Sequence, residues 1–123
     1  MKKLLTLVLL FSLSLFSFGQ ESGEAFVKGN EVSMVAAKKA GVFEFKLPSS
    51  STKEEVEKNK AYYTDYFSVE YKPEIQIAIV KMVNNTPGNR RVITRFLVSN
   101  GVRTVTLDNT KYTVAEFFEN FLN

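Results

Sequence analysis

The sequence contains no cysteine and no histidine among its 123 residues. The absence of cysteine excludes a disulfide scaffold, and it excludes a lipoprotein, whose lipid is attached to a cysteine at the cleavage site. Without histidine or cysteine, the usual nucleophile–base pairs of covalent catalysis cannot be assembled. Soft metal ions such as Cu(I) and Zn(II) also lose their preferred thiolate and imidazole ligands. The sequence therefore predicts a protein that is not an enzyme and that holds no metal or other cofactor.

The one long apolar run lies at the start of the chain. Met1–Lys3 is positively charged, Leu4–Phe18 is apolar apart from one threonine and three serines, and Ser17 and Gly19 place small residues just before Gln20. This three-part layout is typical of a secretory signal peptide. The run is shorter than the about 20 residues that a membrane-spanning helix needs. We therefore expect cleavage after Gly19, export to the periplasm or the extracellular space, and no stable membrane span afterwards.

The basic charge of the chain is reduced once this segment is removed. The formal net charge is +3, and Lys2 and Lys3 account for two of the 16 basic residues, so 14 basic and 13 acidic residues remain from Gln20 onward. A balance this close to neutral lacks the basic footprint of a nucleic-acid-binding protein. The remaining 104 residues suffice for one domain with a single core.

The pattern after residue 19 divides into a leader and a domain. Residues 20–41 are predicted to be a polar leader whose structure stays open, because Val32–Ala37 suits either a short helix or an early strand. The domain is expected over residues 42–123. Its predicted elements are a strand at Val42–Leu47, a helix at Lys53–Tyr66, a hairpin of Phe67–Tyr71 and Ile75–Met82, a helix from Pro87 to about Asn100, a strand at Val102–Leu107 and a final helix from Val114.

This order of elements predicts an α+β fold. A βαββαβ sequence of elements folds as an antiparallel sheet with two helices on one face, the ferredoxin-like architecture, here with an extra C-terminal helix. The strand at Ile75–Met82 is apolar on both faces, which predicts a position in the middle of the sheet.

Two segments resemble heavy-metal-associated domains, a ferredoxin-like family. Phe67–Met82 contains a Val-x-Tyr-Lys-Pro-Glu hairpin similar to the family's central hairpin, and Arg91–Val102 resembles its second helix leading into the last strand. The resemblance spans roughly Val42 to Leu107. The family binds soft metals through a Cys-x-x-Cys pair in the loop after the first strand, but the matching loop here, Pro48–Thr52, offers hydroxyls and no thiol. The resemblance therefore implies the fold without the metal chemistry.

Three tyrosines crowd the predicted first helix and give the clearest indication of a binding surface. Tyr62, Tyr63 and Tyr66 cannot all face the core, and exposed tyrosine is favoured at protein interfaces. We expect Tyr62 and Tyr66 to contact a partner. In the alternative interpretation, Tyr63 belongs to the core and the other two rest on the rim of the sheet.

A basic group marks the start of the predicted second helix. Arg90, Arg91 and Arg95 lie where the helix dipole also favours anions, so they are candidates for docking a carboxylate, a phosphate or an acidic partner. The alternative is ordinary surface charge. By contrast, Ser49–Ser51 beside Lys53 is typical of a turn and a helix cap, and we prefer this to a catalytic Ser–Lys pair.

These observations leave two hypotheses of different classes. The first is a small exported non-catalytic binding module that docks another envelope or secreted protein. The second is a carrier or sensor of a small ligand or metal ion on a fold like that of heavy-metal-associated domains, with a concave site near Ser49–Lys53 or Arg90–Arg95. The oligomeric state is left open by the sequence.

Overall fold

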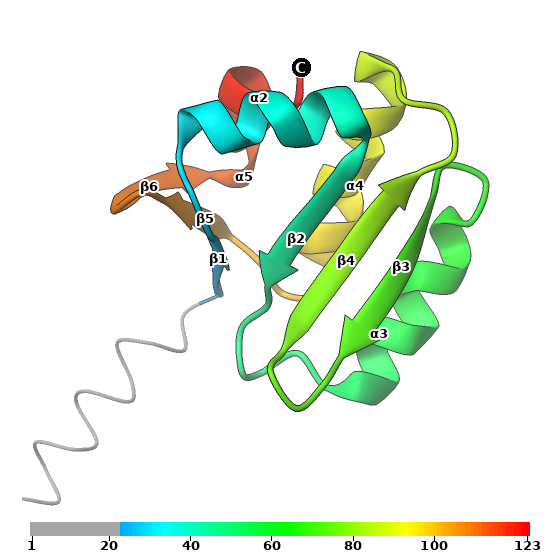
Figure 1. Ribbon diagram of the computed structural model, residues 1–123. Coiled ribbons are helices and arrows are strands. Elements are labelled where there is room, and N and C mark those ends of the chain that lie inside the picture. The colour runs from blue at the N-terminus through cyan, green and yellow to red at the C-terminus, as the bar shows by residue number, and fades with distance from the viewer. Residues whose placement is uncertain (1–22) are drawn as a thin grey trace, which may run out of the picture.

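The computed structural model describes residues 23–123 (Figure 1). The expected signal peptide and its cleavage site at Gly19 lie outside the described residues. Within the described part of the chain, no helix is long and apolar enough to cross a membrane.

The described residues form an α+β fold with a six-stranded mixed sheet. Its strands are β1 (Glu24–Val27), β2 (Val42–Lys46), β3 (Phe67–Lys72), β4 (Ile77–Met82), β5 (Thr104–Leu107) and β6 (Thr110–Thr113). The helices are α2 (Glu31–Ala40), α3 (Lys53–Lys60), α4 (Pro87–Ser99) and α5 (Val114–Phe117), with a 3₁₀ turn η1 (Ala61–Tyr63) and a terminal π-helix η2 (Phe118–Leu122).

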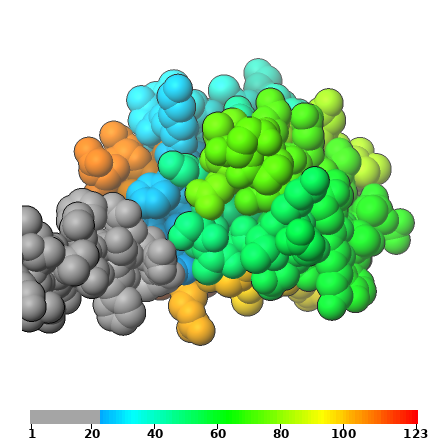
Figure 2. All heavy atoms as spheres, turned by 90° about the horizontal axis from the view of Figure 1, so that it is seen from below, coloured from blue at the N-terminus to red at the C-terminus, as the bar shows by residue number. Residues whose placement is uncertain are grey.

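The sheet has the strand order β3-β4-β2-β1-β5-β6. The predicted hairpin of β3 and β4 is confirmed, and β4 lies in the interior of the sheet, as its two apolar faces predicted. The prediction of a wholly antiparallel sheet is wrong, because β1 pairs in parallel with β5. In the space-filling view from below, blue atoms from the start of the described chain lie between orange atoms near its C-terminal end and green atoms from its middle (Figure 2).

The segment 20–41 contributes two elements to this sheet and core. β1 lies between β2 and β5, where a ferredoxin-like sheet would pair those two strands directly. The stretch that suited a helix or a strand is helical, with Asn30 and Ser33 forming a reciprocal N-cap and Gly41 ending the helix in the left-handed conformation (φ 73°). Met34 is the buried residue of α2. β1 and α2 therefore share one sheet and one core with the elements that follow Val42.

The first predicted helix ends earlier than its pattern suggested. α3 stops at Lys60 and tightens into η1, instead of continuing to Tyr66. This turn places the Tyr63 ring 5.7 Å from Phe67 and 6.1 Å from Phe96, centroid to centroid. Packing of the half-buried Tyr63 ring against the buried Phe67 and Phe96 favours this turn over a continued α-helix.

The elements predicted after the hairpin are confirmed as helix, strand and helix, in α4, β5 and α5. Thr86 caps α4 and Pro87 occupies its first turn, and Thr113 with Glu116 forms the predicted capping box of the last helix. The last helix passes into the π-helical turn η2, which buries Phe118, Phe121 and Leu122.

The core lies on one face of the sheet. Alternate side chains of β2, β3, β4 and β5 are buried there, beneath α3 and α4 (Figure 1). α5 and η2 pack beside α4 on this same side, and the ring of Phe117 lies 6.1 Å from that of Phe45. On the opposite face, Ile77 and Ile79 are half-buried among exposed charged side chains, and none of the described helices lies across it (Figure 1).

Candidate functional site

The predicted tyrosine group is divided by the fold. Tyr63 is partly buried and packs against the core, while Tyr62 is 71% exposed and Tyr66 is 39% exposed. The exposed Val83 lies beside Tyr66, because its backbone N–H donates to the Tyr66 carbonyl at 3.0 Å. The two tyrosines expected to contact a partner are therefore accessible, and whether they do so stays a prediction.

The predicted arginine group is also divided, and one member must be removed from it. Arg90 is 7% exposed, so its expected role in a docking surface is wrong. Its Nε donates to the Leu122 carbonyl at 2.5 Å, and its Nη1 donates to Asn85 Oδ1 at 2.6 Å. Arg90 instead joins the start of α4 to the last turn of the chain.

The other two arginines stand on the exposed side of α4. Arg91 lies 4.2 Å above the Phe118 ring and 3.8 Å from Glu119, which gives it a cation–π contact and a surface ion pair. With Arg95 it borders a groove of about 520 Å³ between α4 and the C-terminal helices. The floor of this groove is mostly apolar, with Val98 and Phe118 among its lining residues.

The hydroxyl loop after β2 has a structural role. Ser51 is buried, and its Oγ donates to the Asn100 carbonyl at 2.6 Å. Asn59 binds the Asn100 side chain at 3.0 Å, so this end of α4 is held from two sides. Burial raises the pKa of the nearby Tyr71 hydroxyl above its ordinary range. The Tyr71 hydroxyl faces the Ser51 carbonyl at 3.5 Å, as its donor.

We expect Ser51→Ala to lower the free energy of unfolding by about 1 kcal/mol, because the Asn100 carbonyl loses a buried donor. Chemical denaturation would measure this loss, and the slope of the unfolding free energy against denaturant concentration should be the same in both proteins. Ser49→Ala is the matched control, since Ser49 is exposed, and it should change stability by less than about 0.5 kcal/mol. Equal effects of the two variants would contradict a specific role of the Ser51 hydroxyl.

A separate concave site lies inside the sheet, where β1 and β2 diverge. β2 and β4 share five register pairs, from Val42 to Lys46, but β1 and β2 share only Phe26 with Lys46. After Val27 the chain leaves the sheet and continues into α2, which returns it to the start of β2 (Figure 1). The space enclosed by the end of β1, α2 and β2 has a volume of about 470 Å³, and we call it the sheet opening.

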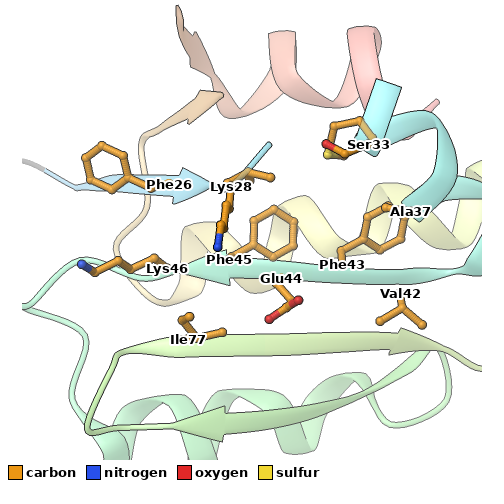
Figure 3. A pocket seen from close by; sticks show the side chains of 12 residues that line it. Phe26, Lys28, Ser33, Ala37, Val42, Phe43, Glu44, Phe45, Lys46 and Ile77 are labelled. Atoms are coloured by element: carbon orange, nitrogen blue, oxygen red, sulfur yellow. The ribbon is translucent and has the colours of Figure 1, made fainter. Parts of the chain in front are cut away.

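The sheet opening has an apolar interior and a charged rim. Its apolar lining residues include Phe26, Val27, Met34, Ala37, Phe43 and Phe45. Lys28, Glu44 and Lys46 add charges, and Figure 3 shows the Lys28 side chain reaching from the β1 side across the space toward β2. Among the described residues, none of the ion pairs includes Lys28. Pockets of about 300–1,000 Å³ with mostly apolar walls and a few polar groups are typical of ligand sites.

Sequence reasoning did not find the sheet opening. Its residues come from β1, α2, β2 and β4, and two of these elements lie in the segment whose structure the pattern left open. The available signals were the apolar Ala25–Val27 run next to Gly29 and the helix cap at Asn30, which together indicate a strand followed by a helix. Pairing of that strand beside β2 depends on contacts between distant residues, so no local pattern reveals it.

The described residues contain no group of three or more acidic, histidine or cysteine side chains that could hold a metal ion. Comparison with known proteins identified no relative: a scan against family models, a search of curated proteins and a search of solved structures each found no match. Inferences about function therefore depend on the sequence and geometry of this chain alone.

Proposed function

We propose that this chain is a small exported non-catalytic binding domain that docks another envelope or secreted protein. The observation that carries the proposal is the sheet opening, a preformed apolar space beside β2, which on its β1 side has a register partner only at Lys46. An unpaired strand edge with adjacent apolar pockets is a common means of binding an extended segment of another protein. Export follows from the signal-peptide pattern at the start of the sequence.

We also propose that the domain is a ferredoxin-like unit with an inserted strand. The order β3-β4-β2 and the placement of α3 and α4 between strands support this interpretation. β5 has the direction expected for the last strand, since it runs parallel to β1, which is antiparallel to β2. Insertion of β1 between β2 and β5 is what creates the sheet opening. The resemblance to heavy-metal-associated domains enters this proposal only through the fold.

A carrier or sensor of a small ligand is the second candidate function. The volume of the sheet opening, about 470 Å³, suits a small molecule as well as a protein segment. This candidate predicts binding without any protein partner. A metal ion as the ligand has no support among the described side chains.

Site-specific photo-crosslinking in the producing cell tests the docking proposal. We expect benzoylphenylalanine in place of Phe26, at the sheet opening, to form an adduct with one dominant exported protein. The same group in place of Glu54, which is exposed on α3 and lines neither the sheet opening nor the groove beside α4, is the control position and should form none. Ala37→Leu, which narrows the sheet opening, should reduce the adduct at position 26.

The same probe in place of Tyr62 tests the tyrosine surface separately. An adduct at Tyr62 with none at Phe26 would place the interface on the tyrosines and contradict the site proposed here. The absence of adducts at both positions would reject the docking function and favour the small-ligand carrier.

A further inference from the structure

One edge of β2 presents free backbone groups to the sheet opening. The Leu47 N–H donates to the Gln76 carbonyl at 2.8 Å, so odd-numbered residues of β2 bond toward β4. Backbone groups of successive strand residues point to opposite sides, and those of Val42 and Glu44 therefore point toward β1. β1 has already left the sheet at this level, and within residues 23–123 no loop or turn bond reaches either residue.

The length of this edge limits what can pair with it. A strand rises about 3.3 Å per residue, so the edge from Val42 to Glu44 matches about three residues of extended chain. One end of the space is closed by α2, and the other end is closed by the Phe26–Lys46 pair. A long strand cannot run through such a space, but the end of a chain can enter it.

The charge and the walls of the space indicate which chain end fits. The Lys28 side chain reaches across the sheet opening (Figure 3), and among the described residues it has no ion-pair partner. An ammonium group favours a carboxylate, and it disfavours the positive amino terminus of a chain. Phe26, Val27 and Ala37 are the more accessible apolar lining residues, and they suit one uncharged side chain. Met34, Phe43 and Phe45 also line the space but are almost fully buried.

We infer that the sheet opening binds the free carboxyl-terminal end of an extended polypeptide whose last residue is apolar. The peptide backbone pairs with Val42 and Glu44, the last side chain enters the apolar space, and Lys28 attracts the terminal carboxylate. This inference rests on the proposed docking function and adds the chemistry of the partner.

The inference is tested by measuring how short labelled peptides bind to the protein. The protein is purified in the form that the producing cell exports. The probe is fluorescein-Ser-Thr-Val-Thr-Leu with a free carboxyl end, measured by fluorescence anisotropy. Two comparison peptides are used. The first has the same sequence with an amide in place of the terminal carboxylate, and the second has proline in place of the second-last residue. Because Lys28 is exposed, we expect amidation to weaken binding about fivefold. Proline should weaken it about as much, because it removes a donor from the pairing strand.

Two variants and a control variant test whether the peptides bind in the sheet opening. Lys28→Gln should bind the acid and the amide equally, and Ala37→Leu should weaken both peptides by filling the apolar space. Lys39→Gln is the matched control, since Lys39 is exposed on α2 and is not a lining residue. In parallel, the amide resonance of Glu44 should shift on peptide addition in the unsubstituted protein, which a general loss of stability would not produce.

The outcomes separate this inference from the docking function. Equal binding of acid and amide, or displacement of the peptide by decanoate at equal concentration, would overturn the inference. If the peptides fail to bind while the Phe26 probe still forms a protein adduct, docking stands and the chain-end chemistry is rejected. Failure of both experiments would reject the two proposals together.

Discussion

Replacing Phe96 by alanine is expected to lower the free energy of unfolding by about 3–5 kcal/mol. Phe96 is fully buried on α4, and its ring lies 5.9 Å from Phe67 and 6.1 Å from Tyr63 in edge-to-face arrangements. Truncation removes the transfer free energy of the ring and leaves a cavity that α3 and the sheet cannot fill without moving. Urea denaturation followed by circular dichroism would measure the loss.

Val98→Ala on the same helix is the control for this prediction. Val98 is 59% exposed, so its truncation should change the free energy of unfolding by less than about 0.5 kcal/mol. A loss below about 1 kcal/mol for Phe96→Ala would contradict the packing described for the aromatic cluster of Tyr63, Phe67 and Phe96.

Replacing Arg90 by methionine is expected to lower the free energy of unfolding by about 2–3 kcal/mol. The variant keeps an unbranched apolar stem but leaves the Leu122 carbonyl without its charged donor, and hydrogen bonds to charged groups contribute about 1.5–3 kcal/mol. The Asn85 side chain loses its partner as well. Hydrogen exchange should accelerate most at η2, because Arg90 joins that turn to α4.

Arg95→Met tests whether this loss is specific to the buried position. Arg95 is exposed on the same helix, so its replacement should change stability by less than about 0.5 kcal/mol. If the two arginine variants were equally stable, Arg90 would belong with the surface charges, as the sequence pattern first suggested.

The arginine group shows where sequence patterns reach their limit. Arg90, Arg91 and Arg95 look equivalent in the sequence, and the dipole argument applies to all three. Only the return of the C-terminal turn to the start of α4 distinguishes Arg90, because it places the Leu122 carbonyl against that side chain. A hydrogen bond between residues 32 positions apart has no local signature.

The tyrosines likewise show which features local sequence patterns predict and which depend on tertiary packing. The argument that Tyr62, Tyr63 and Tyr66 cannot all be buried is confirmed, and Tyr63 is the one that packs, partly buried, against the core. The pattern placed them on a continuous helix, whereas the structure uses a 3₁₀ turn there. Packing of Tyr63 against Phe67 and Phe96 determined this ending, and those two rings come from β3 and α4.

The sequence by itself determined most of the local structure of the domain. Alternating apolar residues specified β2 and β3, and an apolar run specified β4. The caps at Thr86 and Thr113 marked where helices begin, because all these signals act within a few residues. Only the tertiary structure decided that β1 enters between β2 and β5 and diverges from β2, which creates the sheet opening. Which strands become neighbours depends on how apolar faces from distant segments are buried against each other. No single segment of the sequence therefore specifies the order of the strands.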